Sequence, residues 1–173
     1  SSYITHAEPN PTRELGEQLL VLARRHNDPA LLLQAHRALA ETFFWLGDFS
    51  AGREHGTRGS ALYDSRLHSR HAILYAEEPG AYCAAITAWT LWYLGYADQA
   101  RERSVEAVAL ARVGGHPFSI AMALTLEAQI LQLRGETHAA RERAKEGVTL
   151  AVTQGFPFWE TWATMVEGWA LAH

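Results

Sequence analysis

Two stretches forty positions apart, GGHPFSIAMAL at residues 114–124 and QGFPFWETWAT at residues 154–164, share the motif Gly-X-Pro-Phe. Glycine readily adopts the left-handed conformation that ends a helix, and proline is favoured in the first turn of the next helix. Gly115 and Gly155 are therefore expected to end one helix each, with the following proline beginning another. The motif predicts a joint between two helices that the chain uses twice.

The similarity extends outward from both motifs and defines a repeat. Residues 93–124 align with residues 133–164, and a weaker copy covers residues 45–64. The weaker copy lies 48 rather than 40 positions before the next one, which places an insertion near residues 64–78. A period near 40 is typical of stacked units, each of which buries its apolar face only against its neighbours.

Each unit has the pattern of a helical hairpin. Residues 79–95 begin with a proline and end with a glycine, residues 97–115 carry small and apolar side chains on one face, and no segment alternates like a strand. Small residues follow each turn glycine at matching positions, which would let two antiparallel helices approach closely. They are Gly52, Gly56 and Gly59, then Ala100, Ser104 and Ala107, then Ala140, Ala144 and Gly147.

This spacing resembles the tetratricopeptide pattern, with units longer than its 34-residue consensus. We therefore expect an all-α fold, a right-handed tetratricopeptide-like solenoid of about eight helices in stacked antiparallel pairs. Residues 1–173 should form one such domain, and both ends of the sequence are typical of a piece of a larger protein.

The composition is that of an ordinary folded protein without a strong electrostatic signature. Hydrophobic residues make up 48% and charged residues 20% of the chain, and the formal net charge is −4. Basic residues alternate with glutamates instead of clustering, so we expect neither a nucleic-acid partner nor a membrane surface. The chain has one cysteine, no apolar run long enough for a membrane span and no signal-peptide pattern, which favours the cytoplasm.

Residues 47–173 also resemble a more specific family. The matching elements include Leu-Tyr-Asp at 62–64, Leu-Gly-Tyr at 94–96, His-Pro-Phe-Ser at 116–119 and Gly-Trp-Ala at 168–170. They are similar to the C-terminal repeats of large bacterial signalling proteins, which carry a class III adenylate or guanylate cyclase or another output domain, then a STAND-type (AAA-like) ATPase. The resemblance implies a regulatory module whose partners include its flanking domains.

The catalytic parts of that family do not occur in this chain. The only lysine is Lys145, and it does not belong to a Gly-x-x-x-x-Gly-Lys-Ser/Thr phosphate loop. No paired-aspartate motif of a cyclase is visible either. The family usually has an aspartate where Glu78 precedes Pro79, and a glutamate is a poorer helix cap. We expect a chain that is not an enzyme and that binds no cofactor.

Three sets of residues have a chemical interpretation beside a structural one. His68 and His71 could share a metal on one helix, but no cysteine or acidic cluster accompanies them, which favours a structural role. A small enzyme could use His71, Cys83 and Glu127, although a buried structural Cys83 is the simpler interpretation. The arginines of the repeat could recognise an anion, although a solvated helix face with weak ion pairs is the simpler interpretation. They are Arg101, Arg103, Arg141 and Arg143.

The best functional lead is a row of aromatic residues. The chain has six tryptophans, and the first helix of each tetratricopeptide hairpin lines the concave surface. Aligning the turn glycines Gly47, Gly95 and Gly135 predicts the residues that face this groove. The candidate site consists of Arg37, Glu41, Tyr82, Trp89, Trp92, Gln129, Gln132, Trp162 and Trp169. Further inward positions are Gln34, Phe44, Met122, Thr125 and Met165.

Aromatic anchors with few polar groups are the composition of a binding site for a peptide, a protein or a small-molecule effector. The alternative is that the tryptophans simply pack between tightly curled helices. We expect a non-catalytic sensing or protein-interaction module that regulates a larger bacterial signalling protein. A repeat domain of a STAND-type transcriptional activator and a self-associating scaffold are the alternatives.

Overall fold

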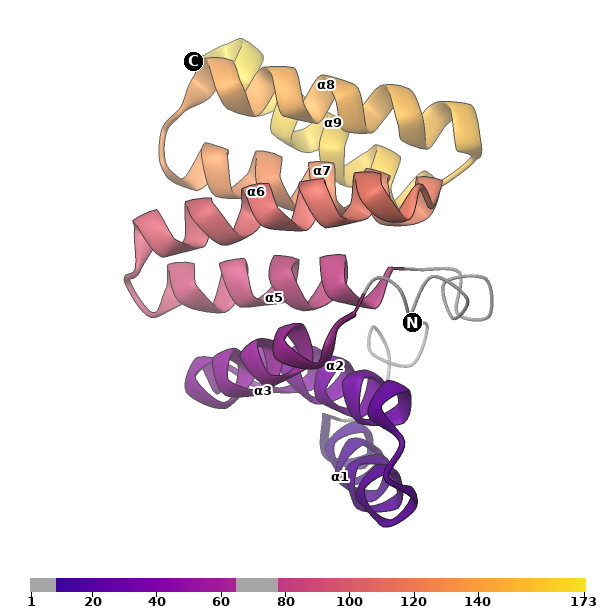
Figure 1. Cartoon of the computed structure of the whole chain (residues 1–173). Coiled ribbons are helices and arrows are strands. Elements are labelled where there is room, and N and C mark those ends of the chain that lie inside the picture. Colours follow the sequence, from indigo (N-terminus) through magenta and orange to yellow (C-terminus); the bar gives the residue numbers. More distant parts are fainter. Residues whose placement is uncertain (1–8, 65–77) are drawn as a thin grey trace.

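The computed structural model describes residues 9–64 and 78–173, and all regular structure in these ranges is α-helical. The helices stack in chain order, with α1 at one end and α8 and α9 at the other (Figure 1). Their bounds are α1 (Pro9–His26), α2 (Pro29–Trp45), α3 (Phe49–Leu62), α5 (Pro79–Tyr93), α6 (Ala97–Gly114), α7 (Pro117–Leu133), α8 (Thr137–Gln154) and α9 (Pro157–Ala172). The expected all-α fold of stacked helix pairs is confirmed; nearly all of the insertion expected near 64–78 lies outside the described residues.

The glycines expected at the joints have the left-handed backbone that these positions require. Gly115 and Gly155 both have φ of 72°, and a proline begins α7 and α9 two residues later. Turns within the hairpins use Gly47, Gly95 and Gly135, with φ of 79°, 86° and 73°. A side chain at positive φ is strained, which explains why glycine recurs at these five places.

A further joint, not expected from the motif, connects α1 to α2. Asn27 takes the place of the glycine with φ of 49°, and Asp28 caps α2 by accepting hydrogen bonds from the backbone N–H groups of Ala30 and Leu31. Asparagine is the residue after glycine that best tolerates this conformation. Since Pro29 then begins α2, α1 corresponds to the second helix of a hairpin.

The small residues at matching positions are buried, and in α3 they are glycines because the next hairpin lies against them. A Cβ atom on Gly52 would lie 2.9 Å from Thr90 Cγ2, and one on Gly59 would lie 2.6 Å from Cys83 Sγ. The equivalent positions in α6, Ala100 and Ala107, are likewise buried. Close packing thus offsets the low helix propensity of glycine.

Two layers of helices result. The inner layer comprises α2, α5, α7 and α9, which contact one another in sequence, and the outer layer comprises α1, α3, α6 and α8. Each outer helix packs against an inner helix on either side wherever both are described. Glu78, at the start of α5, makes no side-chain capping bond, as expected, and hydrogen-bonds Tyr63 instead.

Candidate functional site

Tryptophan rings join the inner helices. Trp89 of α5 lies 5.3 Å from the ring of Phe44 on α2 and 5.1 Å from that of Trp162 on α9. Its indole N–H donates to the backbone carbonyl of Leu126 on α7 at 3.4 Å. Trp89 is only 9% exposed, so most of its ring packs between helices and contributes to the core.

A polar chain lies beside these rings. The indole N–H of Trp162 donates to Gln129 Oε1 at 2.9 Å, and Gln129 Nε2 donates to Gln132 Oε1 at 2.7 Å. Both amides are half-buried. The structure therefore brings Trp89, Trp162, Gln129 and Gln132 together, with the two amide groups held in fixed orientations.

A hollow of about 200 Å³ opens between the C-terminal ends of α5 and α7, and we call it the α5–α7 hollow. Tyr93 and Leu133 line this hollow, are 55% and 41% exposed, and were not predicted from the sequence. The sequence feature that could have identified them is a large apolar side chain two residues before a turn glycine. The hollow is lined by Trp89, Trp92, Tyr93, Gln129, Ile130 and Leu133.

The remaining predicted residues lie in two other places. The Arg37 guanidinium lies 4.6 Å from the centre of the Tyr82 ring, a cation–π geometry, and 3.6 Å from Glu41. Trp169 stacks on His173 at 4.9 Å near the end of α9. Arg37, Glu41 and Tyr82 thus form a separate polar cluster on α2 and α5.

Three of the further inward positions were predicted wrongly. Phe44 of α2 is only 6% exposed and packs on Trp89. Met122 and Thr125 of α7 are fully buried, because α7 contacts α5, α6, α8 and α9 and only a narrow strip of its surface stays exposed. Met165, at the equivalent of Thr125 in the last helix, is 62% exposed.

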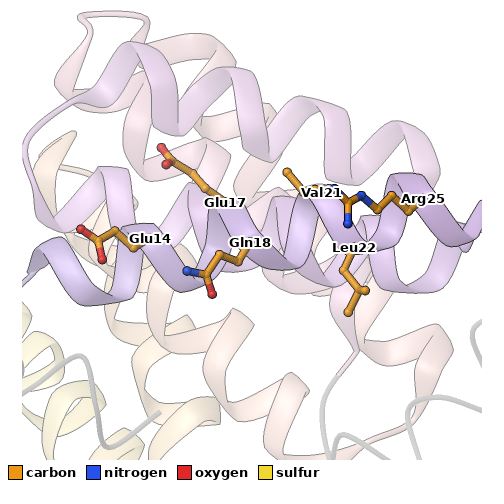
Figure 2. Close-up of a pocket in the computed structure, with 6 residues that line it drawn as sticks. All are labelled: Glu14, Glu17, Gln18, Val21, Leu22 and Arg25. Carbon is orange, nitrogen blue, oxygen red and sulfur yellow. The ribbon is translucent and has the colours of Figure 1, made fainter.

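A second hollow, of about 420 Å³, lies on the face of α1. It contains none of the predicted site residues, and a single helix supplies all of its lining. That lining consists of Glu14, Glu17, Gln18, Val21, Leu22 and Arg25 (Figure 2).

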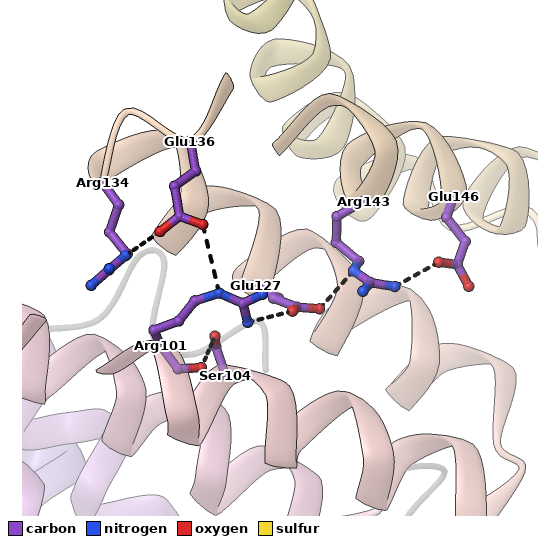
Figure 3. Close-up of polar contacts among 7 residues, drawn as sticks. All are labelled: Arg101, Ser104, Glu127, Arg134, Glu136, Arg143 and Glu146. Carbon is purple, nitrogen blue, oxygen red and sulfur yellow. Dashed lines mark hydrogen bonds and ion pairs between the residues drawn. The ribbon is translucent and has the colours of Figure 1, made fainter. Parts of the chain in front are cut away.

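Glu127 is a buried carboxylate of α7, with 1% of its side chain exposed. Arg101 of α6 donates to its Oε1 at 2.9 Å, and Arg143 of α8 lies 2.7 Å from its Oε2 (Figure 3). Burial raises the pKa of Glu127, although the two arginines oppose that shift. The carboxylate therefore links the two outer helices on either side of α7.

This network corrects the expectation of a solvated arginine face with weak ion pairs at two of its four positions. Arg101 and Arg143 are 29% exposed and bind a buried partner, whereas Arg103 pairs with Glu106 on an exposed surface. A hollow of about 960 Å³ lies over the network between α6 and α8. Its arginines already bind carboxylates of the chain, so it offers few unsatisfied charges to a ligand.

Of the residues of the alternative enzyme, Cys83 and Glu127 do not share a site. Cys83 is fully buried on α5 and faces α3, whereas Glu127 faces α6 and α8. His68 and His71 lie outside the described residues. Within the described ranges, no group of three or more His, Cys, Asp or Glu side chains is arranged to hold a metal ion. Among the same helices, none combines the length and apolar character needed to cross a membrane.

Comparison with known proteins supports the fold and leaves the family open. No family model matches the chain, and no curated protein matches its sequence. The crystal structure of the apo form of RapI, a tetratricopeptide-like helical repeat protein, matches with a TM-score of 0.66 and 12% sequence identity. The match covers 95% of this chain and 63% of RapI, so the chain spans less than two thirds of that protein. A tetratricopeptide-like helical repeat fold is therefore shown.

Proposed function

We propose that this chain is a non-catalytic protein-interaction module, and that its α5–α7 hollow receives a large apolar side chain of a peptide or protein partner. The observation that carries the proposal is the lining of that hollow, in which half-buried and exposed aromatic rings lie beside the oriented Gln129 amide. Aromatic side chains and a few fixed polar groups are typical of such anchor sites.

The size of the α5–α7 hollow favours a peptide over a small-molecule effector. Its volume of about 200 Å³ falls below the roughly 300–1,000 Å³ of small-molecule pockets. It equals the volume of about seven water molecules, which suits one side chain. The amide of Gln132, next to Gln129, provides further hydrogen-bonding groups for a peptide backbone.

Substitution at Trp92 tests this proposal. Peptides selected from a display library on the immobilised chain would be titrated against wild type and Trp92→Ala. Loss of an anchor contact should weaken binding by at least about tenfold, since hot-spot truncations cost about 2 kcal/mol or more. Trp45→Ala is the matched control, because Trp45 is 56% exposed and does not line the hollow.

Equal weakening by both substitutions, or unchanged binding by folded Trp92→Ala, would remove the α5–α7 hollow as the binding site. Trp89 is unsuitable for this test. Its ring contacts Phe44 and Trp162 across three helices, so its removal would destabilise the fold as well.

The larger context is proposed from the sequence resemblance alone. The chain would be the regulatory end of a cytoplasmic bacterial signalling protein with a cyclase or STAND ATPase output. A partner in the α5–α7 hollow would favour one relative position of the α5–α6 and α7–α8 hairpins and pass that preference to the flanking domains. The complete reading frame tests this, since a gene without such an output domain would contradict it.

A further inference from the structure

One face of α9 is exposed although its counterparts in the other inner helices are buried. Leu91, Leu131 and Leu171 are forty residues apart and occupy equivalent positions of the repeat. Leu91 and Leu131 are 3% and 1% exposed, whereas Leu171 is 60% exposed. Met165 is 62% exposed at the position of the fully buried Thr125. The exposed stripe on α9 therefore has the pattern of a surface that another helix covers.

The chain itself shows what kind of helix covers this surface. Within the hairpins, α6 covers α5 and α8 covers α7. Ala140 and Ala144 of α8 belong to the same buried cluster as Ala128 and Leu131 of α7. No described helix occupies the corresponding place on α9, which is the last of the described helices.

The opposite situation holds at α1. This helix corresponds to the outer helix of a hairpin, and the described residues contain no inner helix that pairs with it. When the helices are aligned on the proline that follows each joint, Leu22 is equivalent to Leu110 and Leu150. Both of these leucines pack against the main core cluster. Leu22 is 47% exposed, and the adjacent Val21 is 49% exposed (Figure 2).

We propose that α9 of one copy packs against α1 of a second copy, as the inner and outer helices of a hairpin formed between two chains. Charge favours this pairing, because α9 carries two glutamates and no lysine or arginine, whereas α1 carries three arginines and two glutamates. The two faces lie at opposite ends of the stack (Figure 1). The contact is therefore head to tail and extends the solenoid from copy to copy.

Two variants blocked at opposite ends test this inference. Leu22→Glu places a charge on the α1 face, and the double substitution Met165→Glu with Leu171→Glu does so on the α9 face. In sedimentation and light-scattering measurements, the wild-type mass should rise with concentration, while each variant alone stays monomeric. Mixed in equal amounts, they should form a dimer of twice the monomer mass, because each retains one functional end.

Val113→Glu is the matched control, since Val113 is 76% exposed on α6, away from both faces. This variant should associate like wild type, and helical circular dichroism would establish that every variant is folded. A wild-type chain that stays monomeric at all concentrations, or a mixture of the two folded variants that forms no dimer, would overturn the inference. Association that survives both sets of substitutions would overturn it too. Trp92→Ala should leave the assembly unchanged, which separates this test from that of the α5–α7 hollow.

Discussion

At the scale of single residues, the contact between α3 and α5 depends on the absence of side chains. A Cβ atom on Gly56 would collide with the hydroxyl oxygen of Thr87. That hydroxyl cannot easily turn away, because it donates to the Cys83 carbonyl at 2.6 Å. The helix spacing is thus fixed by glycine on one side and by a small hydrogen-bonded side chain on the other.

Gly56→Ala should destabilise the chain despite the better helix propensity of alanine. Overpacking of this kind costs about 1–3 kcal/mol, measured as the free energy of unfolding in urea. Gly168→Ala is the matched control, because nothing lies within 4 Å of the added Cβ. It should stabilise α9 by about 1 kcal/mol, the propensity gain alone. A stabilising Gly56→Ala would contradict the close approach of α3 and α5.

At the scale of elements, two histidines connect α2 to α3. The Nδ1 atoms of His36 and His55 lie 3.1 Å apart, and His36 is only 5% exposed. Burial, with smaller contributions from His55, Arg58 and Arg24, lowers the pKa of His36 to about 4. Burial likewise lowers the pKa of His55, which Glu54 partly opposes. Both imidazoles are therefore neutral in the folded hairpin at neutral pH.

Acid should weaken this hairpin in a defined pH range. In the unfolded chain these groups titrate near pH 6.5, so the unfolded state binds the extra proton first. Their contribution to stability is present above pH 6.5 and is lost as the pH falls towards 4. Between pH 7.5 and pH 5 the wild-type free energy of unfolding should fall by on the order of 2 kcal/mol. Over the same pH range, the free energy of unfolding of His36→Gln should fall clearly less. An identical fall in both proteins would contradict the role of the histidine pair.

Most of the helices could be predicted from the sequence, because two joints combine a positive-φ glycine with a proline and the turns within the hairpins also carry a positive-φ glycine. The α1–α2 joint was missed for a physical reason, since Asn27 adopts the same conformation without being glycine. Side-chain exposure was harder to predict. An alignment on the turn glycines places Met122 and Trp162 at equivalent positions. Met122 lies on α7, which has neighbours on all sides, whereas Trp162 lies on α9, the last described helix, so their exposures differ.

At the scale of the whole molecule, the inner layer holds its aromatic residues at different depths. Trp89 bridges α2, α7 and α9 through ring contacts and one hydrogen bond, so it is a packing residue. Trp92 is only half-buried and lines the hollow. A pattern of aromatic residues in sequence cannot separate these two roles, because the separation depends on how tightly the hairpins curl.

The most direct test of the proposed interaction site follows the indole N–H signals of the six tryptophans by nuclear magnetic resonance. The chain would be titrated with a peptide selected on the immobilised protein. The signals of Trp92 and Trp162 should shift and saturate with the bound fraction, while that of Trp45 stays in place. Saturable binding that leaves Trp92 and Trp162 unchanged, or that moves only Trp45 or Trp169, would contradict the proposed site.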